Sequence, residues 1–249
     1  MTIKIGVRGS KLAIAYADRV CAELNCSTEI IAIKTEGDLN PDTPIHEIGG
    51  KGVFCSAIEK ALLEGSIDVA VHSLKDIPGD IETEGLEIPA VLERSSPHDV
   101  LIGKVFDGFV LGTSSPRRTA QLKELYKHQN VIIKPIRGNI DTRLEKLDNG
   151  QYDAIVLAEA GLNALNIKRS SIRLPIVPAV GQGIIALQTR TGSDASNIVK
   201  EINHDLTYRQ AMLERALLKG IGGDCTTKVA AYASEDNPIK LEAVYYNEN

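Results

Sequence analysis

The sequence predicts an α/β fold of two lobes joined by two crossing segments, followed by a small α+β third domain. Strand-like apolar runs alternate with amphipathic helical stretches from the N-terminus onward, a pattern typical of parallel sheets with right-handed crossovers. Two proline-containing segments interrupt this alternation, a polar one at 93–99 and one stiffened by two prolines at 174–183. Two helical stretches and a hairpin pattern follow the second interruption, which indicates the third domain.

The first lobe is expected to begin with strand, helix, strand, helix and strand at residues 3–7, 11–24, 28–34, 53–64 and 69–71. Ser10 is a suitable N-cap for the first helix, because its hydroxyl oxygen can accept a hydrogen bond from the helix start. The polar stretch 35–52 is rich in glycine and proline, and its length indicates a functional loop.

The second lobe repeats the alternation. Its strands are expected at 100–102, 110–112, 131–136 and 154–157, and its helices begin at Pro116, capped by Ser115, and at Ile140. A strand at 184–189 returns to the first sheet, helices follow at 194–203 and 206–218, and strands at 229–234 and 239–246 form a hairpin. We therefore divide the chain into domain 1 (1–93 and 183–203), domain 2 (97–175) and domain 3 (206–249).

Composition excludes several classes of protein. The 249 residues carry a formal net charge of −5, which argues against nucleic acid or an anionic membrane as a partner. No apolar run of about 18 residues predicts a membrane span, and no signal-peptide pattern precedes the first strand, so we expect a cytoplasmic protein. The four cysteines form no CxxC pair, so we expect no metal site and free thiols.

The stretch 67–78 is the first candidate site. An apolar run at 69–71 turns polar at Ser73, Lys75 and Asp76 and stops at Pro78. These polar residues therefore fall at the carboxyl end of a strand, where open α/β sheets bind ligands. The alternative is a surface turn that carries a solvated Lys–Asp pair.

Arginines gather at the same kind of position. Most of them follow predicted strands, and the set is Arg8, Arg117, Arg118, Arg137 and Arg143. An acidic chain that places arginines at strand ends is expected to bind a polyanion there, although each could be a solvated surface charge. The chain lacks the Gly-Lys of a P-loop and has no GxGxxG, so carboxylates are favoured over nucleotides.

Two further residues suggest chemistry. A buried Asp76 among these cations would act as an acid–base group or stabilise a developing positive charge. Cys225, in a glycine-rich loop with little apolar cover, is a possible covalent attachment point, although Asp224 beside it should raise its pKa. The residues alone therefore predict a two-lobed binder of an organic polyacid, and they leave open whether it is an enzyme.

With these motifs in view, the chain resembles the porphobilinogen deaminase family, also called hydroxymethylbilane synthases. The matching motifs run through nearly the whole chain: Arg8–Ala13, Gly49–Phe54, Val71–Pro78, Gly112–Arg118, Arg137–Asn139 with Thr142–Leu144, Tyr152–Ile155 and Pro178–Gly183. Each motif alone is weak, but their order and spacing together are very specific.

The resemblance implies an enzyme of tetrapyrrole and haem biosynthesis. Such an enzyme condenses four porphobilinogen molecules head to tail with loss of ammonia and then releases hydroxymethylbilane by hydrolysis. It implies a dipyrromethane cofactor joined by a thioether to Cys225, and a growing oligopyrrole chain as the second ligand. The acetate and propionate groups of each pyrrole would account for the arginines.

The resemblance also assigns roles to residues. It makes Asp76 and Lys75 catalytic, with Asp76 stabilising the cations formed when ammonia leaves and when the next pyrrole attacks. Besides Cys225, it gives cofactor binding to Ser73, Lys75, Asp76, Thr113, Ser115, Arg117, Arg118, Arg137 and Gly138. It gives substrate binding to Arg8, Ser10, Arg143, Gln182, Lys51 and Phe54.

Three departures from the family pattern stand out. Asp224 replaces a glycine before the cysteine, and Lys228 stands where proline is common. Ala164 replaces a basic residue, and Lys168 or Arg169 is the expected substitute. The 24 residues after Cys225 are fewer than usual, so we expect a reduced third domain.

Two other classes share a two-lobed architecture of the periplasmic-binding-protein type. The main alternative is a non-catalytic cytoplasmic binding protein for an organic polyacid, and the other is a transcriptional effector domain. The absence of a signal-peptide pattern and of a helix-turn-helix region, together with the Lys75–Asp76 and Cys225 loops, argues against both. We expect a monomer.

Overall fold

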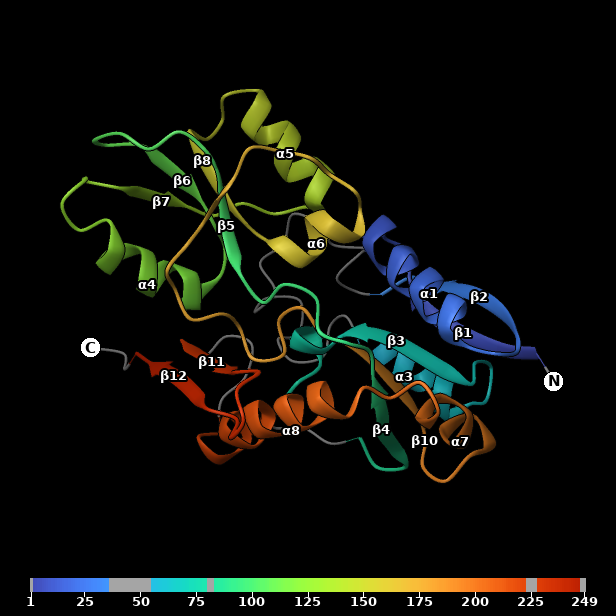
Figure 1. Ribbon diagram of the computed structural model, residues 1–249. Helices are drawn as coiled ribbons and strands as arrows, with labels where there is room; N and C mark the ends of the chain where they lie inside the picture. Colours follow the sequence, from blue (N-terminus) through green and yellow to red (C-terminus); the bar gives the residue numbers. More distant parts are fainter. Residues whose placement is uncertain (1, 36–54, 80–82, 223–227, 247–249) are drawn as a thin grey trace.

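The computed structural model describes residues 2–35, 55–79, 83–222 and 228–246 (Figure 1). The described chain forms two five-stranded sheets, each flanked by helices, and a two-stranded sheet beside a long helix. The α/β prediction of two lobes with a small third sheet is confirmed. No helix in this described part is both long and apolar enough to cross a lipid bilayer.

The first sheet has the strand order β2-β1-β3-β10-β4. Strand β1 pairs in parallel with β2 and β3, whereas β10 runs antiparallel to both β3 and β4. Its elements are β1 (Thr2–Arg8), α1 (Lys11–Glu23), β2 (Ser27–Ile33), α3 (Ser56–Leu63), β3 (Val69–Ser73), β4 (Leu86–Val91), β10 (Ile185–Arg190) and α7 (Asp194–Lys200).

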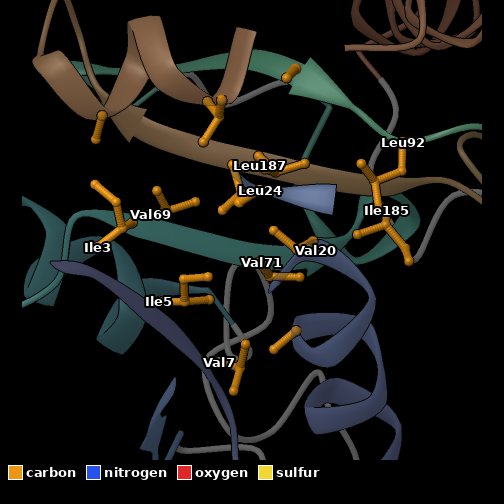
Figure 2. Close-up of a cluster of buried hydrophobic side chains, with 14 residues drawn as sticks. Ile3, Ile5, Val7, Val20, Leu24, Val69, Val71, Leu92, Ile185 and Leu187 are labelled. Carbon is orange, nitrogen blue, oxygen red and sulfur yellow. The ribbon is translucent and has the colours of Figure 1, made fainter. Parts of the chain in front are cut away.

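Alternation along β3 decides which layer each side chain joins. Val69 and Val71 pack with Ile3, Ile5 and Val7 of β1 and with α1 on one face of the sheet (Figure 2). Ala70, between them, joins α3 on the opposite face. Each fully buried Val or Ile side chain contributes about 1.5–3 kcal/mol relative to exposure, so this two-sided core holds β3 in place.

The second sheet has the order β7-β6-β8-β5-β9. Strand β6 is parallel to β7 and β8, and β5 is antiparallel to β8 and β9. Its elements are β5 (Asp99–Gly103), β6 (Val110–Gly112), α4 (Pro116–Leu125), β7 (Ile132–Lys134), α5 (Ile140–Asp148), β8 (Ala154–Ala158), α6 (Glu159–Ala164) and β9 (Ile172–Arg173).

Each crossing segment delivers an antiparallel strand, β5 to the second sheet and β10 to the first. The parallel pairing expected of a βαβαβ unit therefore holds for β1 with β2 and β3 and for β6 with β7 and β8. The sequence analysis assigned no strand to β4, which contains Pro89. Strand β4 lies at an edge of the sheet, where a missing N–H is tolerated. Strand β7, expected over 131–136, ends at Lys134, because the next residue, Pro135, has no N–H with which to continue the ladder.

The two crossings touch through their backbones. Ser95 N donates a 2.9 Å hydrogen bond to Gly183 O. Gly183 has φ +85°, and a Cβ there would lie 2.7 Å from the carbonyl oxygens of Ser95 and Ser96. Only glycine fits this close approach. The lobes also meet away from the crossings, where Lys11 Nζ of α1 lies 2.9 Å from Asp141 Oδ2 of α5.

A buried ion pair joins both crossings to the third unit, which comprises α8 (Asp205–Gly220), β11 (Val229–Ala233) and β12 (Leu241–Tyr245). Glu214 of α8 accepts a 2.6 Å hydrogen bond from Arg94 of the first crossing. The same carboxylate accepts from the backbone N–H of Gly181 in the second crossing, at 2.7 Å, and of Ala233 in β11, at 2.8 Å. Both side chains of the ion pair are almost fully buried.

Glu214→Gln should lower the free energy of unfolding by about 3 kcal/mol, because it leaves the Arg94 guanidinium buried without a counter-charge. It also places an amide N–H₂ among three donors. Denaturant titration measures the loss. Glu124→Gln, in the exposed Lys127–Glu124 pair, is the matched control and should leave stability unchanged. Equal stability of the two variants would contradict the assignment of Glu214 as the junction.

Candidate active site

The turn after β3 is fixed by a buried side chain and by hydrogen bonds to the second crossing and to α8. Its residues form the short 3₁₀ turn η1 (Leu74–Asp76). Leu74 is fully buried, and its backbone N–H donates a 2.9 Å hydrogen bond to Ile184 O of the second crossing. On the far side of the turn, Arg215 of α8 donates to the carbonyl oxygens of Ile77 and Pro78 at 3.3 and 3.1 Å. Lys75 and Asp76 therefore project from a fixed turn.

A pocket lies at the carboxyl ends of β1 and β3. Its polar lining includes Arg8, Ser10, Ser73 and Asp76, and its empty volume is about 400 Å³, part of it open solvent. These residues meet because β1 and β3 are parallel neighbours, in the register Ile5↔Val69 and Gly6↔Ala70. The sequence analysis expected a buried Asp76, and this was wrong: the residue is exposed, because the pocket around it is open.

Helix α1 contributes two polar groups to this pocket. Ser10 is its N-cap as predicted, with its hydroxyl accepting from Ala13 N at 3.3 Å. Tyr16 lies less than two turns further along and was not predicted. Burial and the negative charge of Asp76 raise the pKa of Tyr16 to about 12. The sequence signal was its spacing from Ala13, because residues three apart share one helix face.

The guanidinium groups of Arg117 and Arg118 both bind the side-chain carboxylate of Asp99. Arg118 donates to Asp99 Oδ1 through Nε at 3.0 Å and Nη2 at 2.6 Å, and Arg117 Nη2 lies 2.8 Å from Asp99 Oδ2. Asp99 begins β5 and is fully buried. Burial alone would raise its pKa, but the two guanidiniums outweigh burial and lower it. Sequence reasoning assigned Asp99 to the crossing and missed this role.

A series of hydrogen bonds connects Asp99 to Lys75 in the turn after β3. Gln182 of the second crossing donates to Asp99 Oδ1 at 3.1 Å and accepts from Lys75 Nζ at 3.5 Å. Burial lowers the pKa of Lys75 to about 8, opposed in part by the charge of Asp76 and reinforced by Arg118. Lys75 and Gln182 therefore lie together, as expected of one site.

The remaining cations belong to the second lobe. Arg143 of α5 donates to Gly138 O at 2.8 Å. Burial, followed by repulsion from Arg118 and Arg137, lowers the pKa of Arg143 to about 10. This repulsion shows that Arg118, Arg137 and Arg143 are brought together, although they are widely separated in the chain.

Two hydroxyls at the end of β6 serve the local backbone. Ser115 is the N-cap of α4, as predicted, and accepts from Arg118 N at 3.3 Å. Thr113 Oγ1 accepts from Ser115 N at 3.2 Å. Both residues therefore fix the helix start that presents Arg117 and Arg118.

Several predicted site residues lie outside the described part of the chain, namely Lys51, Phe54, Asp224 and Cys225, together with most of the 35–52 loop. Among the departures, Ala164 ends α6 and Arg169 forms an exposed ion pair with Asp148. The expectation that Lys168 or Arg169 substitutes for a basic residue at position 164 stays a prediction.

The arrangement is suited to an organic polyacid. Around Asp76 and Asp99 lie Lys75, Arg8, Arg117, Arg118, Arg137 and Arg143, so cations outnumber carboxylates. The pKa values of Lys75 and Arg143 are both lowered, as expected where burial and neighbouring positive charge disfavour a cation. The described residues contain no group of His, Cys, Asp and Glu side chains that could hold a metal ion.

Comparison with known proteins identifies the family. Residues 3–198 match the family described as "Porphobilinogen deaminase, dipyromethane cofactor binding domain". A probable porphobilinogen deaminase of Archaeoglobus fulgidus is 43% identical over 97% of this chain and 86% of its own length. The porphobilinogen deaminase of Ehrlichia canis is 43% identical (100% and 89%), and that of Neisseria meningitidis serogroup A is 40% identical (94% and 80%).

Solved structures add no independent argument. Substrate binding domain 2 of Lactococcus lactis GlnP, in an open conformation, is 14% identical with a TM-score of 0.45, and the match covers 89% of this chain and 90% of that chain. The sequence relatives do not favour the non-catalytic alternative. The chain is a transferase with a dipyrromethane cofactor binding domain, and it belongs to the porphobilinogen deaminase family.

Proposed function

We propose that this chain is a hydroxymethylbilane synthase that joins four porphobilinogen molecules head to tail and releases ammonia at each addition. The observation that carries the proposal is the Asp76 carboxylate, which faces an open pocket among cations from both lobes. Family membership supports the same reaction. Hydrolysis of the finished chain then gives hydroxymethylbilane.

The excess of positive charge supports binding of the pyrrole carboxylates. Asp99 neutralises one of the two guanidiniums of Arg117 and Arg118, so the pair keeps a charge of about +1. We assign binding of the incoming porphobilinogen to Arg8, Ser10, Arg143, Gln182, Lys51 and Phe54. We assign cofactor binding to Ser73, Lys75, Asp76, Thr113, Ser115, Arg117, Arg118, Arg137 and Gly138.

Asp76 and Lys75 are the proposed catalytic residues. Each addition breaks the C–N bond of an aminomethyl group and forms a C–C bond, with the pyrrole α-hydrogen lost as a proton. Positive charge develops on a pyrrole nitrogen in this sequence, and an adjacent carboxylate stabilises it. Lys75, with a pKa of about 8, can hold or release a proton near neutral pH.

The residues fit a dipyrromethane primer, which when bound supplies the free pyrrole position that accepts the first substrate. We propose that it is joined by a thioether to Cys225. The flanking elements lie beside the crossings, because Ala231 N of β11 donates to Pro178 O at 3.2 Å. Leu218 of α8 and Val229 of β11 likewise pack with Val180 of the second crossing.

We also propose the organisation of the molecule. Domain 1 comprises 1–93 and 183–203, domain 2 comprises 97–175, and domain 3 comprises 206–249. We place the enzyme in the cytoplasm, where free thiols such as Cys21 and Cys26 persist. It acts as a monomer, because one chain supplies all the residues assigned to the site.

Asp76→Asn should abolish turnover, lowering kcat at least about 100-fold, because the amide keeps the shape of the side chain but not its charge. Tetrapyrrole formation from porphobilinogen, followed by absorbance after oxidation, measures turnover. The melting temperature should match the wild type. Retained activity would remove Asp76 from the mechanism.

Cys225→Ser should give a folded protein without primer. Intact-protein mass of the wild type should exceed the sequence mass by two linked pyrrole units, which peptide mapping should place on Cys225. Cys21→Ser is the control and should keep the added mass. A primer retained in the Cys225 variant would contradict the anchor assignment.

Lys75 should make stability depend on pH. Its pKa is about 8 in the folded chain and near 10.5 when unfolded. Between these values the unfolded state binds more protons, so stability rises with pH, whereas below about pH 8 the full penalty of burying the charge remains. Lys75→Met should therefore be the more stable chain at pH 7.

This advantage of Lys75→Met should shrink by about 1–3 kcal/mol between pH 8 and pH 10.5. Urea titrations of both chains across this range measure it. An advantage that stays constant with pH would show that Lys75 has an ordinary pKa.

A further inference from the structure

A chain of hydrogen bonds lies behind the turn that carries Asp76, on the face of the first sheet covered by α3. His72 Nε2 lies 3.2 Å from Gln188 Oε1, and Gln188 Nε2 donates to Glu59 Oε1 at 2.9 Å. At the other end, Cys55 Sγ lies 3.8 Å from His72 Nδ1. The set of Cys55, His72, Gln188 and Glu59 is called the α3 relay below.

Sheet register and helix spacing build the α3 relay. His72 of β3 pairs with Ala186 of β10, so Gln188 lies two residues along on the same face. Cys55 is the N-cap residue of α3, and Glu59 lies four residues later, one helical turn on. His72, Gln188 and Cys55 are all buried.

The donors and acceptors of the α3 relay have one consistent direction. Gln188 donates its amide N–H to Glu59, so its oxygen is the atom that faces His72. Thr83 Oγ1 also donates to Glu59, at 2.9 Å. His72 Nε2 must then carry the proton, which leaves Nδ1 as the acceptor that faces Cys55. Burial lowers the pKa of His72, which keeps the imidazole neutral.

Cys55 connects the α3 relay to the catalytic turn. Its thiol donates to the backbone carbonyl of Asp76 at 3.3 Å. The Asp76 side chain is exposed in the pocket, where its charge acts on Lys75 and Tyr16. The direction of this carboxylate therefore depends on how the backbone of the turn is held. Cys55, His72 and Asp76 all line the same pocket.

We propose that Cys55 is a positioning residue for Asp76: its thiol holds the Asp76 carbonyl, and the α3 relay fixes the thiol. The inference rests on the proposed function. It adds a residue that acts on Asp76 through the backbone of the turn. Among the described residues, His72 Nδ1 and Asp76 O both lie within reach of the thiol, so the α3 relay also sets how firmly the carbonyl is held.

The first test compares Cys55→Ala with Cys55→Ser and with Cys21→Ala, a partly buried cysteine in the core on the other face of the sheet. Cys55→Ala should lower kcat about five- to tenfold, the effect of one hydrogen bond, with KM changed less than twofold. Cys55→Ser keeps a donor and should recover most of the loss. Cys21→Ala should match the wild type.

Equal losses in Cys55→Ala and Cys55→Ser would overturn the proposal, as would an unchanged kcat in Cys55→Ala. If Cys55→Ala melts early, Gln188→Met, which keeps the side-chain volume, carries the test. In a double-mutant cycle on kcat, Cys55→Ala with Gln188→Met should lose no more than the worse single variant. Losses that multiply would show that the two residues act separately.

The second test does not need turnover. Nitrogen-15 NMR of histidine-labelled chain should show His72 neutral with its proton on Nε2, and the His72→Gln variant assigns its signal. Cys55→Ala should shift the Nδ1 resonance, because Nδ1 loses the thiol group that lies 3.8 Å away. A proton on Nδ1, or no shift in the variant, would overturn the α3 relay. A wild-type chain that makes no tetrapyrrole would refute the proposed function and leave this result standing.

Discussion

The rest of the architecture depends on the hydrogen bonds and the ion pair of the buried Glu214 carboxylate. It binds Arg94 of the first crossing and the backbone of Gly181 in the second, and it lies on α8, which reaches into the third unit. A charge this deeply buried is tolerable only with its donors in place. The two crossings and α8 are therefore held together at one point. That point adjoins Gln182 and, through Arg215, the turn that carries Asp76.

The second organising feature is the excess of positive charge around Asp99. Asp99 binds Arg117 and Arg118, which keeps them ordered without neutralising both, and Arg143 and Arg137 add further positive charge nearby. An ordered cluster with an excess of positive charge is preorganised for a polyacid, because little reorganisation is needed when carboxylates arrive. The same field reaches Lys75, where burial and Arg118 favour the neutral amine. Charge in the second lobe thus acts on Lys75 of the first.

The sequence predicted most of the fold, because strands and helices with strong apolar periodicity follow local rules. The N-caps Ser10 and Ser115 were found from their own chemistry. Strand β4 was missed because Pro89 is compatible with a strand only at a sheet edge, and edges are set by tertiary pairing. The site was predicted as a set of residue types. The exposure of Asp76, the Asp99 partnership and the place of Tyr16 in the pocket depend on contacts between segments far apart in the chain.

The sequence by itself determined the alternation of strands and helices, the gathering of polar residues at strand ends and the family to which the chain belongs. These follow from the order of residues, because periodicity and motif spacing are local properties. Only the tertiary structure decided which acid binds the arginines, how the crossings deliver the antiparallel strands β5 and β10, and what lies behind Asp76. The α3 relay joins residues up to 129 positions apart. Burial and distance between such residues arise only when the chain has folded.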